Sequence, residues 1–263
     1  MPRINNIFGL HGDFSWKEEY VAYIDILGYK ELIALSKADP SLVNTIINII
    51  DGTYIDSLEI LNAFFSERSN GIRETFGRPL KYRAFSDCIC FWSETIEGDE
   101  HIDETLYNFF IQLVFIQARF NCQGIFLNGC LSKGKHFAGE NILFSEGLSN
   151  AFTITERINH NPAILIDDCI YNEIQELPVG RQRYFEEFIY TESDKRYINY
   201  LNAICKIHNY DNLRNITLDA IREIIADRIE EYQGSIQAKY LWLKRYFNHT
   251  IQENDLDRTL IIQ

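Results

Sequence analysis

Apolar and polar positions follow one another along the chain in a pattern that predicts a sheet flanked by helices. Short apolar runs suited to buried strands alternate with segments in which apolar residues recur every three or four positions, as in amphipathic helices. The expected strands are residues 21–24, a hairpin over 80–94, then 125–132, 142–144 and 163–167. The expected helices are residues 30–37, 41–65, 102–120, 147–157 and 169–177. This order predicts an α/β (α+β) chain whose central sheet is mainly antiparallel, because it contains a hairpin.

The pattern changes after Pro178, which suggests a C-terminal extension. A second hairpin is expected to turn at Ser193 and Asp194, and two amphipathic helices should follow it. The segments concerned are residues 188–192, 196–201, 218–232 and 235–250. We expect the extension to pack on the sheet domain or to support dimerisation. The resulting division is an irregular lead-in (1–18), a catalytic-type domain (19–177) and the hairpin and helical extension (178–263).

Two segments combine a predicted strand with an acidic residue at its end. In EYVAYIDILGYKELI the apolar run reaches Asp25, and Gly28 then turns the chain into a helix. In KYRAFSDCICFWSE two apolar and aromatic runs flank Ser86 and Asp87, which is typical of a hairpin whose turn carries a carboxylate. Two such carboxylates suit a hard divalent cation, which binds few protein carboxylates and takes its other ligands from water and phosphates. An ordinary turn role for Asp25 and Asp87 stays open at this point, because Asp is favoured in turns.

Composition and charge narrow the classes of function. The formal net charge of −13 argues against nucleic acid or an anionic membrane as a partner, whereas a nucleoside triphosphate held through metal ions fits it. The chain has no apolar run long enough for a membrane span and no basic-then-apolar N-terminal signal, so we expect a soluble cytoplasmic protein. The six cysteines lie mostly in apolar surroundings, which is typical of reduced core thiols.

The order strand, Asp, glycine turn, helix, hairpin with a Ser-Asp turn, helix and strand resembles the catalytic domain of class III nucleotide cyclases. In its details the chain is most similar to the cyclases of the Pycsar anti-phage systems, which make cyclic pyrimidine mononucleotides. The resemblance covers about residues 20–177, and a weaker similarity is found near the C-terminus. The segments that carry it are AYIDILGYKELI, AFSDCIC, LNGCLSKG, GLSNAFTITERI followed by NPAILIDD, and AKYLWLKRYFNHTI.

The resemblance implies a site with two divalent metal ions, Mg²⁺ or Mn²⁺. Asp25 and Asp87 would bridge both ions, and the carbonyl of Ile26 would add a ligand. Class III sites form between two catalytic domains, so a chain with one such domain implies a symmetric homodimer with two composite sites.

Substrate contacts are expected around the turn that follows Asp25. The peptide N–H groups of residues 27–30 would cradle the triphosphate, and Gly28 suits a close approach of backbone to phosphate. Tyr29 is an aromatic side chain that could stack on a base, and a packing role for it stays open. The other candidate contacts are Lys30, Arg83, Lys133, Lys135 and Ser149.

Some positions depart from the class III pattern. The two positions that read adenine in purine cyclases hold Arg83 and Ile142, which favours a pyrimidine nucleotide. Arg83 could donate to a ring carbonyl, or it could be a plain half-exposed strand arginine. Uracil presents two carbonyl acceptors and cytosine one, so we expect UTP to be preferred over CTP.

Further departures concern phosphate binding and the transition state. The phosphate-binding arginine of relatives falls on Asn128, and the transition-state Asn and Arg fall on Ser149 and Thr153. Arg157 lies one turn beyond Thr153 on the same helix face and is the candidate catalytic replacement. Lys133 and Lys135 are the candidate phosphate-binding replacements, although lysine lacks the planar fork of arginine. These cations could equally be plain surface charges.

We expect a metal-dependent pyrimidine nucleotide cyclase that converts UTP, or CTP, to a 3′,5′-cyclic mononucleotide and pyrophosphate. The product would be a second messenger in anti-phage signalling, read by a separate effector protein. The alternative is a catalytically inactive cyclase-fold module that binds nucleotide or supports assembly, and the retention of both acids favours the enzyme. A two-metal polymerase or nuclease would need a basic nucleic-acid track that the charge of −13 does not suggest.

Overall fold

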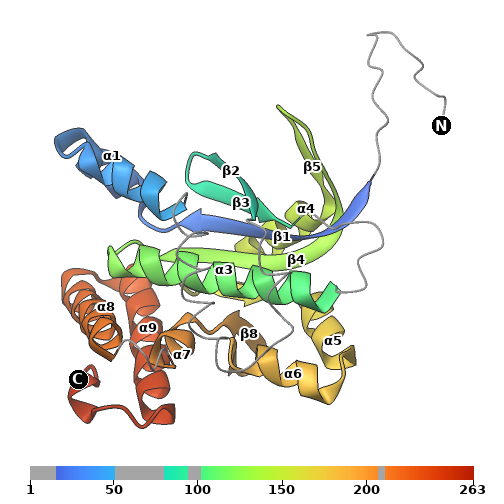
Figure 1. Cartoon of the computed structure of the whole chain (residues 1–263). Helices are drawn as coiled ribbons and strands as arrows, with labels where there is room; N and C mark the ends of the chain where they lie inside the picture. Colours follow the sequence, from blue (N-terminus) through green and yellow to red (C-terminus); the bar gives the residue numbers. More distant parts are fainter. Residues whose placement is uncertain (1–15, 51–79, 94–101, 207–210) are drawn as a thin grey trace.

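The computed structural model describes residues 16–50, 80–93, 102–206 and 211–263 (Figure 1). Its strands are β1 (Lys17–Ile26), β2 (Lys81–Phe85), β3 (Cys88–Trp92), β4 (Leu127–Ala138), β5 (Leu143–Ser145), β6 (Ile164–Ile166), β7 (Ile189–Glu192) and β8 (Lys195–Ile198). They form one eight-stranded sheet in the order β2-β3-β1-β4-β6-β8-β7, with β5 paired to β4. Every pair is antiparallel except β4 with β6.

Helices lie on both faces of this sheet and at one end of it (Figure 1). They are α1 (Tyr29–Ala38), α3 (Ile102–Cys122), α4 (Glu146–Arg157), α5 (Asp168–Glu176), α6 (Val179–Glu186), α7 (Tyr200–Cys205), α8 (Asp211–Glu231) and α9 (Gly234–Glu253). Residues 41–50 are helical too, and the rest of the helix expected over 41–65 lies outside the described residues. The predicted fold class is confirmed: a mostly antiparallel sheet, flanking helices, and a C-terminal hairpin followed by helices.

β1 is an interior strand of the sheet, which explains the apolar run that ends at Asp25. It pairs with β3 on one side and with β4 on the other. Alternate side chains point to opposite faces of a strand. Ala22 and Ile24 are fully buried in the main core, to which α3 contributes Phe109. Val21 is buried on the other face, where Leu148 of α4 packs against its cluster. The run is therefore apolar throughout because both faces of the sheet are covered.

β4 is longer than the sequence predicted. The predicted strand ends at residue 132, but β4 continues through Gly134 to Ala138. A Cβ built on Gly134 would lie 2.8 Å from the backbone nitrogen of Gly147 in the first turn of α4. The glycine therefore allows α4 to approach the sheet closely, and it does not serve a turn.

The C-terminal hairpin continues the central sheet. β8 pairs with β6 through Leu165 and Tyr197, and β7 forms the edge. The strand expected to run to Leu201 ends at Ile198, because the side chain of Asn199 accepts a hydrogen bond from the N–H of Asn202 and caps α7. Helices α6 and α7 were not predicted. The division of the chain at residue 178 stays a prediction.

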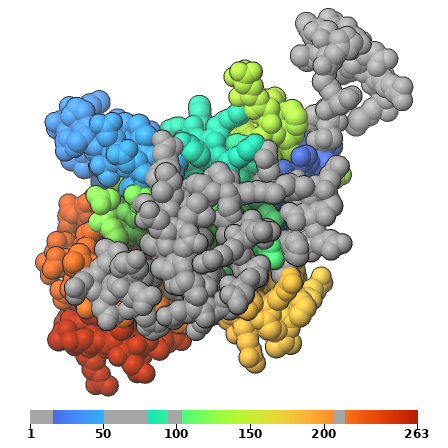
Figure 2. Space-filling model, viewed as in Figure 1, coloured from blue at the N-terminus to red at the C-terminus, as the bar shows by residue number. Residues whose placement is uncertain are grey.

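The first helix is packed differently from the others. None of the residues of α1 is buried, and Figure 2 shows it projecting from the body above the C-terminal helices. All six cysteines are free, and three of them are buried. Over the described ranges no helix has the length and apolar character needed to cross a membrane.

Candidate active site

The two predicted acids meet at one end of the sheet. Asp25 is the penultimate residue of β1, and Asp87 lies in the two-residue turn between β2 and β3. Ser86, the other turn residue, has a φ of 54°, in the left-handed region that such tight hairpin turns require. The N–H of Ile26 donates a hydrogen bond of 2.8 Å to the carbonyl of Asp87. This bond ties the turn to the end of β1 and holds the two acids together.

The site carries an excess of negative charge. Burial, followed by the charges of Asp87 and Glu156, raises the pKa of Asp25 to about 6. Lys239 acts in the opposite direction and lowers the pKa of the same carboxyl. Burial and then the charge of Asp25 raise the pKa of Tyr23 above its usual range. A carboxylate in such surroundings favours a nearby cation.

A divalent ion fits this donor set. Two carboxylates and a peptide carbonyl are hard oxygen ligands of the kind that Mg²⁺ and Mn²⁺ bind. Among the described residues, no group of three His, Cys, Asp or Glu side chains lies close enough to hold an ion alone. Any ion held by Asp25, Asp87 and the carbonyl of Ile26 would therefore need further ligands, such as water or phosphate oxygens.

The turn after Asp25, which is predicted to bind phosphate, is a glycine turn that begins α1. Gly28 has a φ of 73°, where a side chain would be strained, and its carbonyl accepts hydrogen bonds from the N–H groups of Glu31 and Leu32. Gly28 is thereby the N-terminal cap of α1. Lys30 is exposed, and Tyr29 is half-buried against the main core. Its predicted stacking on a base stays a prediction.

Next to the acids lies a hollow of about 660 Å³, here called the aromatic pocket. Its lining residues are Trp16, Tyr23, Arg83, Phe85, Cys88, Cys90, Leu143, Phe144, Ser145, Glu146, Leu148, Ser149 and Phe152. The structure thus brings the predicted substrate residues Arg83 and Ser149 together. Nη2 of Arg83 donates two hydrogen bonds of 2.8 Å, to the carbonyls of Gly139 and Glu140. These bonds hold the guanidinium at the wall of the pocket.

The predicted phosphate-binding lysines lie elsewhere. In the β1–β4 register, Lys133 is opposite Tyr20 and Lys135 is opposite Glu18. These partners lie five and seven residues before Asp25, roughly 17 and 24 Å along an extended strand. The amine of Lys133 forms an ion pair of 3.1 Å with Glu173. Both lysines therefore lie far along β4 from the acids of their own chain, and their role as phosphate ligands stays a prediction.

The positions that depart from the class III pattern are also placed. Asn128 lies opposite Asp25 on β4, but its side-chain amide donates to the carbonyl of Asn159. The hydroxyl of Thr153 donates to the carbonyl of Ser149 within α4. Arg157 is exposed in the last turn of α4. Arg157 is therefore accessible to a partner molecule. The side chains of Asn128 and Thr153, by contrast, are engaged in hydrogen bonds to nearby backbone carbonyls.

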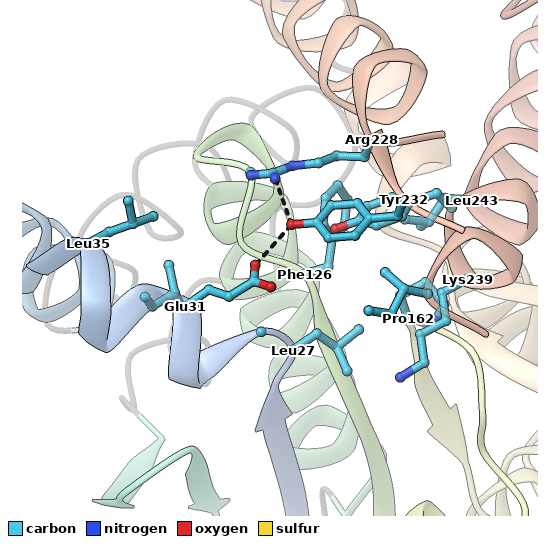
Figure 3. A pocket seen from close by; sticks show the side chains of 14 residues that line it. Leu27, Glu31, Leu35, Phe126, Pro162, Arg228, Tyr232, Lys239 and Leu243 are labelled. Carbon is cyan, nitrogen blue, oxygen red and sulfur yellow. Dashed lines mark hydrogen bonds between the residues drawn. The ribbon is translucent and has the colours of Figure 1, made fainter. Parts of the chain in front are cut away.

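A second, smaller hollow of about 120 Å³ lies between α1 and the C-terminal helices (Figure 3). We call it the α1–α9 cavity. Its lining residues are Leu27, Gly28, Glu31, Leu32, Leu35, Gly124, Phe126, Pro162, Arg228, Tyr232, Ile236, Lys239, Tyr240 and Leu243. The hydroxyl of Tyr232 donates to Glu31 at 2.9 Å and accepts from Nη1 of Arg228 at 3.1 Å. These bonds link α1 to α8.

Sequence reasoning missed two charged residues of this region. Glu156, on α4, acts on Asp25 and is the residue just before the candidate Arg157. Lys239 also acts on Asp25 from α9. The only sequence signal for Lys239 was the weak C-terminal similarity in AKYLWLKRYFNHTI, which contains it.

Fold and site together define an α/β protein with a candidate two-carboxylate cation site at the end of its central sheet. No protein-family model matches the chain, and no curated protein matches it. Solved structures similar to it include the monomeric guanylyl cyclase domain of the RhoGC fusion protein from the aquatic fungus Blastocladiella emersonii. That match has 13% identity and a TM-score of 0.41, and it covers 70% of this chain and 98% of the other.

Two further matches have similar values. One is the catalytic core of a rhodopsin-guanylyl cyclase with converted specificity, in complex with ATPalphaS: identity 13%, TM-score 0.40, coverage 69% and 94%. Another is the guanylyl cyclase Cya2: identity 10%, TM-score 0.38, coverage 70% and 91%. A likeness of this size carries no argument about what this chain does.

Proposed function

We propose that the protein is a metal-dependent nucleotide cyclase. The observation that carries the proposal is the meeting of Asp25 and Asp87 at the end of β1, directly before the Gly28 turn. The raised pKa of Asp25, caused by burial and then by the charges of Asp87 and Glu156, supports a cation at this place. The Gly28 turn supports a phosphate-bearing substrate beside that cation.

Different residues would have different roles in the reaction. When bound, two Mg²⁺ or Mn²⁺ ions activate the ribose 3′-oxygen and neutralise charge on the leaving group. Asp25, Asp87 and the carbonyl of Ile26 would hold these ions, and the backbone N–H groups around Gly28 would orient the triphosphate. The 3′-oxygen then bonds to the α-phosphorus, the bond from that phosphorus to the bridging oxygen breaks, and pyrophosphate leaves. The hydroxyl proton passes to water.

We propose that a second copy of the chain covers the aromatic pocket and completes the site. Large apolar side chains are exposed at its edge: Phe85 is 77% exposed, Phe144 62% and Phe152 47%. Exposed apolar surface of this kind favours a partner. In a symmetric dimer, Arg83 and Arg157 of one copy would meet Asp25 and Asp87 of the other. Arg157 would then stabilise charge at the α-phosphate.

The substrate we propose is a pyrimidine nucleotide, with UTP preferred over CTP. Arg83 uses Nη2 for the carbonyls of Gly139 and Glu140, which leaves the Nε and Nη1 hydrogens to bind a base. Uracil offers two carbonyl acceptors to a guanidinium. Ile142 lies two residues after Glu140 and is 55% exposed. Its apolar side chain offers no acceptor for the exocyclic amine of adenine or cytosine.

We also propose that the product is a second messenger, read by a separate effector in anti-phage signalling in the cytoplasm. This part of the proposal rests on the sequence resemblance alone.

A second candidate is a nucleotide-binding module without turnover. The observation in its favour is that Asn128, Ser149 and Thr153 stand where the resemblance expects phosphate-binding and transition-state groups, and that Asn128 and Thr153 bond locally. Binding of nucleotide with no product would support this candidate.

The proposed function is tested by incubating the protein with Mn²⁺ and each of ATP, GTP, CTP and UTP, and identifying the products by mass. We expect cyclic UMP in the largest amount, with pyrophosphate in equal quantity. Absence of any cyclic nucleotide, while UTP binds, would replace the enzyme by the binding module. Equal turnover of purines and pyrimidines would remove the role of Arg83 in base choice.

A further inference from the structure

The α1–α9 cavity adjoins the Gly28 turn. One wall is formed by Leu27 and Gly28, which directly follow the metal-site residues of β1, and another by Lys239 and Tyr240 of α9. In Figure 3, Lys239 and Leu27 lie at one end of the cavity, whereas Glu31, Tyr232 and Arg228 lie at the other. The C-terminal extension therefore contributes one side of a hollow whose other side is the predicted phosphate turn.

The two cationic side chains that line this cavity differ in whether their charge already has a partner. Arg228 forms an ion pair of 2.7 Å with Glu231 and a hydrogen bond of 3.1 Å to Tyr232, so its charge is already engaged. Lys239 is half-buried, and its amine forms no hydrogen bond or ion pair with any residue in the described ranges. The amine nitrogen of Lys239 points toward Leu27 in Figure 3. Lys239 is therefore the cation available to a ligand at this end of the cavity.

The size of the cavity indicates which part of a ligand it can hold. Its volume of about 120 Å³ is well below the roughly 300–1,000 Å³ of pockets that enclose a whole small molecule. It has room for a compact polar group such as one phosphate. A phosphate bound by the backbone at Gly28 would carry its remaining negative charge toward the amine of Lys239. Lysine binds phosphate as a point charge and needs no fixed fork geometry.

We propose that Lys239 binds the phosphate tail of the nucleoside triphosphate, in the same chain that holds the metal-binding acids. The inference rests on the proposed function for the identity of the substrate. It also accounts for a missing charge, because Asn128 on β4 is neutral and bonded to Asn159, and Lys133 is bonded to Glu173. A residue of α9 would thus supply the cation that β4 does not.

The competing explanation is that Lys239 only balances the charge of Asp25. Burial and the charges of Asp87 and Glu156 raise the pKa of Asp25, and Lys239 opposes them. On that explanation, removal of Lys239 would leave phosphate affinity unchanged. The two explanations therefore differ in the binding of a phosphate chain that has no base and no reaction to undergo.

The test is calorimetric titration of the full-length protein with inorganic tripolyphosphate, with UTP as a second ligand, in the presence of Mn²⁺. We expect Lys239→Gln to weaken the binding of both ligands by roughly tenfold or more, which is the loss of one charge-assisted hydrogen bond. Lys239→Arg should restore most of the affinity. The matched control is Arg245→Gln, which removes an exposed positive charge from the same helix outside the cavity and should change nothing.

Three results would overturn the proposal: tripolyphosphate that fails to bind wild-type protein, unchanged affinity in Lys239→Gln, or an equal loss in Arg245→Gln. Thermal unfolding of each variant separates loss of the fold from loss of the contact. A weakened Lys239→Gln in a protein that turns over no nucleotide would refute the proposed cyclase while supporting this inference. Normal turnover with unchanged tripolyphosphate affinity in Lys239→Gln would do the reverse.

Discussion

The aromatic pocket and the α1–α9 cavity lie near the same acids but are closed in different ways. The aromatic pocket, of about 660 Å³, opens beside exposed side chains such as Phe85 and Phe144, which the described part of the chain leaves uncovered. The α1–α9 cavity, of about 120 Å³, is closed by α8 and α9 of the same chain, with Tyr232 bonded to Glu31. The difference is what our proposals predict: one chain would complete the phosphate side of the site, whereas the base side would need a second copy.

The largest loss of activity is expected from variants of the two acids, which lie near both hollows. Asp25→Asn or Asp87→Asn should lower product formation at least about a thousandfold, because an amide cannot balance the charge of a divalent ion. Product quantified by mass spectrometry with Mn²⁺ checks this. The control is Asp227→Asn, an exposed aspartate on α8, which should keep full activity. Undiminished product from either acid variant would remove the metal site from the account.

A smaller loss is expected when the cover of the aromatic pocket is disturbed. Phe85→Asp or Phe144→Asp places a charge in the proposed interface, so sedimentation velocity should show monomers and activity should fall by roughly tenfold or more. Ile216→Asp is the matched control, because Ile216 is 67% exposed on α8, away from this pocket. A Phe85→Asp protein that stays dimeric and fully active would mean that the pocket is not covered by a second copy.

Base choice should respond to a milder change in the same pocket. Arg83→Lys keeps the charge but loses the planar fork and its two bonds to the carbonyls of Gly139 and Glu140. We expect the ratio of kcat/KM for UTP to that for ATP to fall by roughly tenfold, as one hydrogen bond in a buried site is lost. The ratio serves as its own control against a general loss of activity. An unchanged ratio would show that another group reads the base.

The smallest effect concerns stability and follows from the charge around Asp25. Burial, with the charges of Asp87 and Glu156, raises the folded-state pKa of Asp25 to about 6, so its ionised form costs stability at neutral pH. Metal-free Asp25→Asn should therefore be more stable than wild type by up to about 2 kcal/mol at pH 8. The gain should shrink as the pH falls from about 6 to 4, because the wild-type carboxyl then becomes protonated. Denaturant unfolding at several pH values measures it, and a destabilised variant at pH 8 would contradict it.

The side of the site built by β1 and the hairpin was predictable because its signals are local. An apolar run ending in Asp25, a glycine turn and a two-residue hairpin turn at Asp87 each depend on a few adjacent residues. The fold class followed from the order of such elements. The position of Gly134 inside β4 was not predictable, because its reason is the close approach of Gly147 in another element.

The positions of the lysines relative to Asp25 and Gly28 could not be predicted from such local signals. Whether Lys133 reaches Asp25 depends on the β1–β4 register, which the residue spacing alone does not give. Lys239 is brought to the Gly28 turn by the packing of α9 beside α1, more than 200 residues apart in the chain. Tertiary packing of this kind leaves only a weak local signal, which is why the lysines of LNGCLSKGK were preferred to Lys239 in AKYLWLK.

The most direct test of the account is complementation between two inactive proteins. One carries Asp25→Asn, and the other carries Arg83→Ala with Arg157→Ala. In an equal mixture with free subunit exchange, half of the dimers are mixed, and one of the two sites in each contains no altered residue. We therefore predict recovery of roughly a quarter of wild-type cyclase activity. No activity above that of the separate variants, with subunit exchange demonstrated by native mass spectrometry, would contradict the composite site.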